Sequence, residues 1–348
     1  MKIINKISLN SKIIFLILIS ISLVSCSTNE TSDSIKDIAF LRNSFLGKGI
    51  NFGNALEAPN EGDWGVVIQD EYFDIVKNLG FKSIRLPIKW SAHLNIDTII
   101  EPKFFERVDY LINKSISKGI PIIINVHHFD EIFREPEKYK IVLYKIWNQI
   151  VVRYKNTSSL LYYEILNEPQ GNLTSNIWNE IIDSVVKIVR KYDKNKTILI
   201  GSYNWSSIWG LEELQLPNDN NIIVAFHFYE PIEFTHQGAE WIPGSESWLG
   251  RKWPENENDL LFMREAVHIA VNWAKEKNVP LHCGEFGAYY KADSLSRIRW
   301  TERLVDLLDE NNISFAYWEF CAGFGIYNPR TQIYDWGLIN ALIKKRTK

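Results

Sequence analysis

Short apolar runs alternate with longer amphipathic segments along most of this chain, and that alternation restricts the folds that the chain can adopt. The runs with the length and β-branched content of strands are residues 50–54, 83–87, 121–128, 160–168, 197–202, 222–229, 279–286 and 313–320. Helical patterns between them include 104–117, 139–154, 178–192, 259–277 and 295–310. Repeated strand–helix units predict an α/β fold with parallel strands joined by right-handed crossovers.

Eight strand candidates in a chain of 348 residues favour a closed (β/α)8 TIM barrel over an open sheet. The length suits one such barrel and does not demand a second domain. The sequence has no internal repeat, no Gly-rich phosphate loop and no dinucleotide fingerprint. We therefore expect a single catalytic domain over residues 37–348.

The first residues have the pattern of an export signal. Lysines precede an apolar run over residues 13–24, which is too short for a comfortable membrane-spanning helix. The run ends in Leu23-Val24-Ser25-Cys26, which resembles a bacterial lipobox and implies cleavage before Cys26 and lipidation of its thiol. An ordinary secretion signal with a chance cysteine is the alternative. We expect a lipoprotein signal peptide over 1–25, a flexible polar tether over 26–36, and a secreted protein lipid-anchored in the bacterial cell envelope.

Charge and cysteine content exclude two classes of protein. Lys and Arg number 39 and Asp and Glu number 42, for a net charge of −3, which argues against a nucleic-acid-binding surface. With Cys26 in the leader, only Cys283 and Cys321 remain, so a disulfide framework is excluded. We expect two buried free thiols, although a single bridge stays open, and we expect a monomer.

The aromatic content allows two interpretations. The chain has 13 Trp, 15 Tyr and 18 Phe. They can belong to a large core, or they can offer flat ring faces on which the apolar face of a pyranose stacks.

Polar residues gather at the carboxyl ends of the predicted strands, where a core position would be costly for them. In a barrel these strand ends share one face, which is where barrel enzymes place their active sites. The residues are Arg85, His127, His128, Asn167, Glu168, His227, Tyr229, Glu285, Trp318 and Glu319.

Two carboxylates on opposite sides of a barrel mouth suit glycoside hydrolysis, in which one protonates the leaving oxygen and the other attacks the anomeric carbon. Arg85 near one carboxylate would hold it ionised, and burial would raise the pKa of the other. A retaining mechanism predicts a carboxyl separation of about 5–5.5 Å.

Metal binding is the rival use for the histidines. His127 and His128 are adjacent, so on a strand their side chains start toward opposite faces. The sequence has neither an H-E-x-x-H motif nor a cysteine cluster. We expect no metal and no organic cofactor, and we expect the histidines to hydrogen-bond sugar hydroxyls or the carboxylates.

Asn167-Glu168-Pro169 and Gly284-Glu285-Phe286-Gly287 resemble glycoside hydrolase family 5 of clan A, in which two glutamates end strands four and seven. Supporting motifs stand in the same order at residues 49–54, 84–87, 126–128, 227–229 and 316–320, so the resemblance covers the chain from Gly47 onward. Residues 53–65 and 234–241 are similar to a subgroup of bacterial endo-β-1,4-glucanases (cellulases), some of which also cleave β-mannans.

The resemblance implies a role for each matching residue. Glu168 would be the proton donor and later the base, and Glu285 would be the nucleophile of a double displacement. Arg85 and Tyr229 would position Glu285, and Asn167 would hydrogen-bond the 2-hydroxyl of the sugar being cleaved. The remaining positions would bind substrate, with Trp318 as a stacking floor and Trp241 and Asn54 extending the cleft. They are Asn54, His127, His128, His227, Trp241 and Trp318.

Several alternatives stay open at this stage. The chain could be a β-mannanase or another β-glucanase of the same family, or a surface lipoprotein that binds glycans without cutting them. Glu57 and Glu240 are either substrate contacts or solvated loop charges. Three tryptophans read as structural or peripheral rather than central: Trp205, Trp248 and Trp253.

Overall fold

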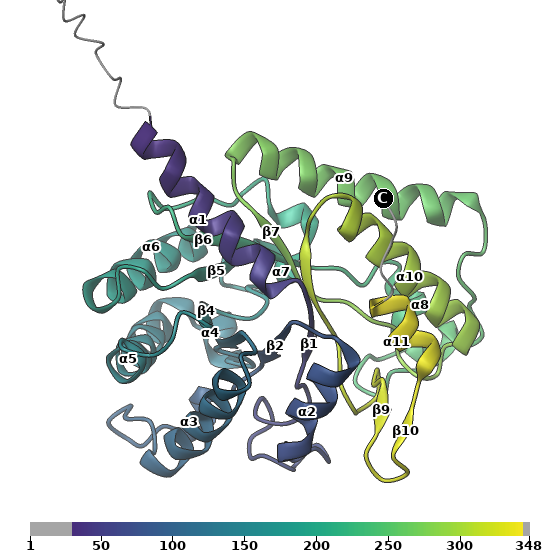
Figure 1. Cartoon of the computed structure of the whole chain (residues 1–348), viewed down its shortest axis with the longest axis horizontal. Coiled ribbons are helices and arrows are strands. Elements are labelled where there is room, and N and C mark those ends of the chain that lie inside the picture. The colour runs from purple at the N-terminus through teal and green to yellow at the C-terminus, as the bar shows by residue number, and fades with distance from the viewer. Residues whose placement is uncertain (1–29, 344–348) are drawn as a thin grey trace, which may run out of the picture.

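The computed structural model describes residues 30–343 and shows a closed barrel of eight parallel strands in chain order, with β1 paired to both β2 and β8 (Figure 1). The (β/α)8 prediction is confirmed. The strands are β1 (Lys48–Asn51), β2 (Ser83–Leu86), β3 (Ile122–Asn125), β4 (Leu161–Glu164), β5 (Ile198–Gly201), β6 (Ile222–His227), β7 (Leu281–Glu285) and β8 (Ser314–Tyr317).

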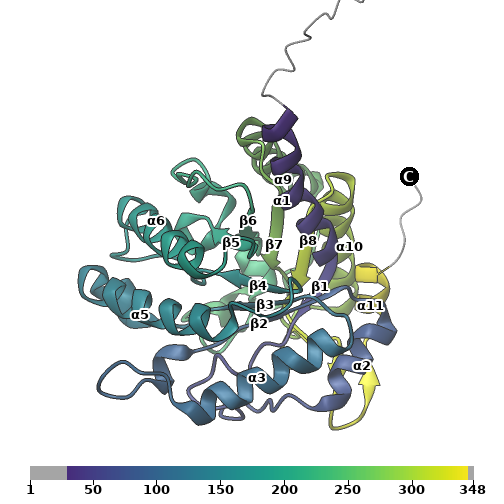
Figure 2. The same ribbon diagram turned by 60° about the vertical axis from the view of Figure 1, so that its left-hand side comes forward.

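Helices surround the barrel and connect its strands (Figures 1 and 2). The α-helices are α1 (Glu30–Leu46), α2 (Asp70–Leu79), α3 (Pro102–Ser117), α4 (Asp130–Arg134), α5 (Pro136–Tyr154), α6 (Ser175–Tyr192), α7 (Tyr203–Ser206), α8 (Ile232–Thr235), α9 (Glu257–Lys277), α10 (Ser294–Glu310) and α11 (Trp336–Ile343). Short 3-10 helices are η1 (Trp90–His93), η2 (Ile208–Gly210) and η3 (Ser245–Trp248). A hairpin of β9 (Tyr327–Asn328) and β10 (Ile333–Tyr334) follows β8.

The strands form because their residues are apolar and are covered on both sides. Almost every strand residue is buried, as expected for parallel strands between a barrel interior and a layer of helices. The helices carry one apolar stripe each. In α6, for example, Trp178, Ile182, Val185 and Val189 recur at helical spacing and are buried.

The observed strands are shorter than the predicted ones, and the difference matters most in β4. This strand ends at Glu164, so Asn167 and Glu168 lie in the segment that follows it and not on the strand itself. Glu168 has a positive φ of 47°, which regular strand geometry does not allow. Its side chain is therefore aimed by an irregular turn above the barrel.

The N-terminal end of the barrel is closed by an apolar layer. Leu46, at the end of α1, packs with Ile123, Tyr162, Leu199 and Ile223, which point inward from neighbouring strands. The hydroxyl of Tyr162 donates to the Arg42 carbonyl at 3.0 Å.

Helix α1 is also fixed by polar contacts. Asn43 Nδ2 donates to the Leu281 carbonyl at 3.0 Å, and Ser314 Oγ donates to Asn43 Oδ1 at 2.6 Å. Both views show α1 lying across the barrel with its first turns projecting beyond the other elements (Figures 1 and 2).

The predicted tether differs from the structure over part of its length. Helix α1 begins at Glu30, so residues 30–36, expected as tether, are helical. The signal peptide over 1–25 and Cys26 lie outside the described residues and stay predictions. Over the described part of the chain, no helix has the length and apolar character needed to span a bilayer. Cys283 and Cys321 are both free thiols, the first buried and the second half-buried.

Candidate active site

A cavity of about 1210 Å³ opens at the C-terminal ends of the strands. Most of the predicted site residues line it: Asn54, His127, His128, Glu168, His227, Tyr229, Trp241, Glu285 and Trp318. Arg85 and Asn167 are buried behind its wall, at 0% and 4% exposed. The expected contact of Asn167 with a sugar hydroxyl stays a prediction.

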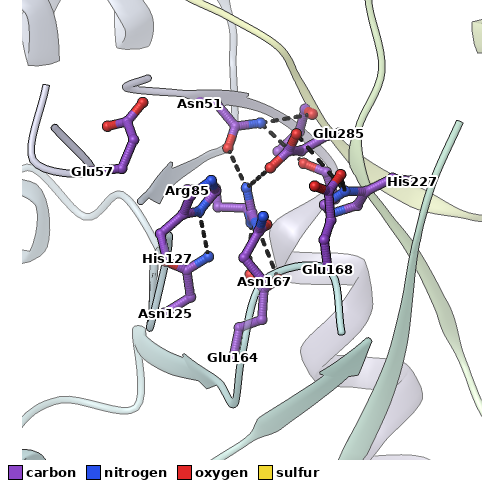
Figure 3. A network of polar contacts seen from close by, with 12 residues as sticks. Asn51, Glu57, Arg85, Asn125, His127, Glu164, Asn167, Glu168, His227 and Glu285 are labelled. Atoms are coloured by element: carbon purple, nitrogen blue, oxygen red, sulfur yellow. Dashed lines mark hydrogen bonds and ion pairs between the residues drawn. The ribbon is translucent and has the colours of Figure 1, made fainter. Parts of the chain in front are cut away.

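Arg85 is the centre of a buried polar network (Figure 3). Its Nε and Nη2 donate to the two oxygens of Glu164 at 2.6 and 2.8 Å. Nη1 donates to Asn51 Oδ1 at 3.0 Å and to Glu285 Oε1 at 2.6 Å, and Nη2 also donates to Asn167 Oδ1 at 2.7 Å. Every N–H of the guanidinium is therefore used, which fixes its plane.

This network holds the charge of Arg85 despite complete burial. Burial lowers the pKa of Arg85, but the neighbouring carboxylates of Glu164 and Glu285 outweigh it and raise that pKa above its ordinary value. A guanidinium with two carboxylate partners stays charged, and it fixes one oxygen of Glu285 in place.

Glu285 ends β7 and receives hydrogen bonds on both oxygens. Besides Arg85, the Tyr229 hydroxyl donates to Oε2 at 3.0 Å. Burial raises the pKa of Glu285, and the charges of His227 and Arg85 oppose that rise without cancelling it. Both hydrogen bonds favour the ionised form, so the carboxylate is held with defined geometry at the cavity wall.

Glu168 is more accessible, with 28% of its side chain exposed against 6% for Glu285. Its Oε1 lies 2.9 Å from His227 Nδ1. Burial raises the pKa of Glu168, but the hydrogen bond and charge of His227 lower it below its ordinary value. Burial lowers the pKa of His227, but the charge of Glu285 and the hydrogen bond and charge of Glu168 raise it above its ordinary value. The pair holds a proton between an imidazole nitrogen and a carboxylate oxygen.

Glu168, His227 and Glu285 approach one another closely. One carboxylate oxygen of each glutamate and one nitrogen of His227 all lie within 4.8 Å of one another. The spacing could also suit a cation, but Arg85 Nη1 already occupies a position 2.6 Å from Glu285 Oε1 and repels positive charge. So close an approach of the two carboxylates suits the shorter carboxyl separation used in glycoside hydrolysis, about 5–5.5 Å, and not the longer one of about 6.5–9.5 Å.

His127 is a neutral imidazole with a fixed tautomer. Its Nδ1 accepts from Asn125 Nδ2 at 3.1 Å, which places its proton on Nε2. Burial lowers the pKa of His127 well below its ordinary value. Its ring lies parallel to Trp318 with centroids 5.9 Å apart. His127 and His128 follow β3 rather than forming part of it, and both line the cavity, so the prediction that they point to opposite faces was wrong.

The ring of Trp318 lies close to the backbone of the loop that follows β1. A Cβ on Gly53 would lie 2.9 Å from its ring, so only glycine permits this approach. Trp241 is 56% exposed and its ring meets that of Tyr289 at 4.9 Å, and Trp318 packs against the cluster that contains Tyr289.

Glu57 and Glu240, each expected to be either a substrate contact or a solvated loop charge, differ in burial. Glu57 is buried, accepts from the backbone N–H groups of Asn54 and Ala55, and has its pKa raised to about 8 by burial, so it is no solvated charge. Glu240 is exposed and pairs with Lys291 at 2.7 Å.

The three tryptophans expected to be structural or peripheral also differ in exposure. Trp253 is buried and Trp248 is half-buried, whereas Trp205 is 52% exposed and lines the cavity. The prediction that Trp205 is peripheral was therefore wrong.

Sequence reasoning missed the partners of Arg85. Glu164 is a carboxylate at the end of an otherwise apolar strand, and Asn51 ends the buried strand β1. Asn125, which ends β3, was also missed and is the partner of His127. A charge in such a strand requires a buried partner, and that signal could have identified Glu164.

A parallel barrel with two glutamates facing each other across its C-terminal cavity, one held by an arginine and one by a histidine, defines a glycoside hydrolase. A family model described as "Cellulase (glycosyl hydrolase family 5)" matches residues 47–323. The chain belongs to glycosyl hydrolase family 5.

Individual relatives agree with that assignment. Endoglucanase H of Acetivibrio thermocellus is 33% identical over 311 residues, which cover 87% of this chain but only 33% of that protein. Cel5A of Thermotoga maritima, solved with mannotriose, superposes with a TM-score of 0.86 at 48% identity and covers 88% of this chain and 100% of its own. The same protein was also solved with cellobiose.

Proposed function

We propose that this protein is a retaining endo-β-1,4-glucanase that hydrolyses β-glucan chains of cellulose or mixed-linkage type. The observation that carries the proposal is the close approach of Glu168 and Glu285, within 4.8 Å, with Glu285 held by Arg85 and Tyr229. The family and the endoglucanase relatives support the substrate class.

In the first step, Glu285 attacks the anomeric carbon and the bond to the leaving oxygen breaks. Arg85 and Tyr229 keep the attacking carboxylate aligned throughout. Glu168 transfers its proton to the leaving oxygen. A bound sugar removes water from Glu168, which raises its pKa and returns to it the proton shared with His227.

In the second step, Glu168, now ionised, removes a proton from water, and the water attacks the anomeric carbon. The bond to Glu285 breaks and the carboxylate is regenerated. Two inversions at one carbon give net retention. Trp318 and His127 would bind the sugar at this position, because their near-parallel rings line the same wall.

β-Mannan is a second candidate substrate. The Thermotoga maritima relative has been solved with mannotriose as well as cellobiose. We also propose that the mature chain is secreted and anchored through a lipid on Cys26, which rests on the sequence of residues 1–26 alone.

The test measures reducing-sugar release from carboxymethylcellulose, barley β-glucan, xyloglucan and glucomannan. Glu285→Gln should lose activity about a thousandfold or more, because the nucleophile is removed. Glu168→Gln should lose roughly 10²- to 10⁴-fold on polysaccharide, yet keep a rapid first step on an aryl cellobioside whose leaving group needs no proton. Glu310→Gln, an exposed glutamate at the end of α10, is the control and should be unchanged.

A parent enzyme that binds one of these polymers but releases no sugar would contradict the proposal and favour a glycan-binding protein. Release from glucomannan alone would instead favour a mannanase.

A further inference from the structure

Two aromatic side chains lie exposed on the cavity wall away from Trp318. Trp209 in η2 is 47% exposed and Phe262 in α9 is 45% exposed. Their ring centroids are 6.3 Å apart at an interplanar angle of 45°. Both residues line the cavity that contains Glu168 and Glu285. An apolar patch in a concave, solvent-open site is typical of a ligand-binding surface.

The loop that carries Trp209 is held in an unusual conformation. Three successive non-glycine residues, Asn204, Trp205 and Ser206, have positive φ values of 59°, 57° and 53°. Such values cost energy and persist where the surroundings enforce them. The backbone next to Trp209 is tightly packed, because a Cβ on Gly210 would lie 1.9 Å from the Tyr203 carbonyl oxygen. The loop therefore presents its tryptophans in a fixed direction.

The position of this loop identifies the part of a glucan that it faces. Trp205 N donates to the Pro169 carbonyl at 3.1 Å, so the loop adjoins the residue that directly follows Glu168. Trp318, by contrast, approaches Gly53 in the loop after β1, and β1 lies across the eight-stranded barrel from β5, which the loop of Trp209 follows. Because the proton donor stands next to the leaving oxygen, the loop side of the cavity receives the leaving part of the chain.

The chemistry of the cavity restricts the ligand to a neutral one. Among the described residues, its wall includes Glu230 and Glu233 but no lysine or arginine. Arg251 pairs with Glu233 at 3.3 Å but does not line the wall, so a uronic-acid polymer would meet carboxylates there without a lining cation to bind its own charge. The C–H face of a neutral pyranose carries partial positive charge and suits the negative face of an aromatic ring.

We propose that Trp209 and Phe262 form a binding subsite for the leaving, reducing-end portion of a neutral β-linked glucan, beyond the sugar next to the cleaved bond. The inference rests on the proposed function and adds to it a residue pair that selects for chain length. Longer oligosaccharides reach this pair, whereas substrates without a sugar in the leaving group do not.

The test compares two substrates, cellohexaose and an aryl cellobioside whose leaving group contains no sugar. In Trp209→Ala and Phe262→Ala, kcat/KM for cellohexaose should fall about 2- to 13-fold, the range expected for losing one aromatic contact. The value for the aryl cellobioside should stay unchanged. Trp336→Ala removes a tryptophan that is 57% exposed and lies outside the cavity wall, and it should change neither value.

Equal losses on both substrates would overturn the subsite, since they would indicate a damaged catalytic centre. Unchanged cleavage of cellohexaose by both variants, with an active parent, would also overturn it while leaving the proposed function intact. A parent that cuts neither substrate would overturn the proposed function, and the subsite with it.

Discussion

The N-terminal end of the barrel is closed by apolar side chains, whereas the C-terminal end keeps charged groups buried beneath an open cavity. Leu46 and its neighbours fill the first end without any charged group. Arg85, Glu164 and Glu285 occupy the second, where every charge needs a partner. The two ends therefore differ in what a substitution removes, which is stability alone at the first and both stability and chemistry at the second.

The largest effect should come from Arg85→Met, which leaves the carboxylates of Glu164 and Glu285 buried without their cation. We expect the free energy of unfolding to fall by about 3–5 kcal/mol and the activity of the remaining folded protein to fall as well. Guanidinium unfolding and kcat measured on one preparation test both. The control, Arg153→Met, removes an ion pair with Asp109 whose arginine is 40% exposed, and should cost about 1 kcal/mol or less.

Leu46→Ala tests the apolar N-terminal end of the barrel, where we expect a loss of stability without a loss of activity. Removing this buried side chain should destabilise the fold by about 2–5 kcal/mol, while kcat per folded molecule stays at the parent value. Leu41→Ala, on the same helix but 53% exposed, should change stability by less than about 0.5 kcal/mol. A fall in kcat for Leu46→Ala would show that the two ends are coupled.

The smallest expected effect is on how the free energy of unfolding depends on pH. Burial lowers the pKa of His282 to about 3, with Nδ1 2.7 Å from Ser314 Oγ, whereas an unfolded histidine titrates near 6.5. Below about pH 6.5 the unfolded state binds a proton that the folded state does not. Stability is therefore full above this pH and falls on acidification by up to about 1.4 kcal/mol per pH unit.

Chemical unfolding at several pH values between 5 and 7 measures that slope. His282→Gln should make the pH dependence shallower by about one proton's contribution. An identical slope in the variant would mean that His282 is protonated in the folded protein. Buried His236 at the cavity, whose pKa is lowered to about 4, contributes to the slope that remains.

The sequence predicted the eight strands because parallel strands covered on both sides leave near-continuous apolar runs. It predicted where Glu168 and Glu285 lie because short motifs mark the strand ends. It did not predict the network around Arg85, because Glu164 lies within an apolar run and its partner is 79 positions away in sequence. It also placed residues 30–36 in a tether, since the polar composition there hides a helix whose contacts are with distant strands.

The placement of α1 determines on which side of the domain an N-terminal fusion partner or solid support would lie. The final residue of α1, Leu46, packs into the end of the barrel opposite the cavity. The first turns of α1 project outward (Figure 2). A fusion partner, an immobilising resin or a surface joined ahead of residue 30 would therefore stand on the far side of the domain from the cavity. Long polymers could then enter the cavity from open solution without passing the attachment.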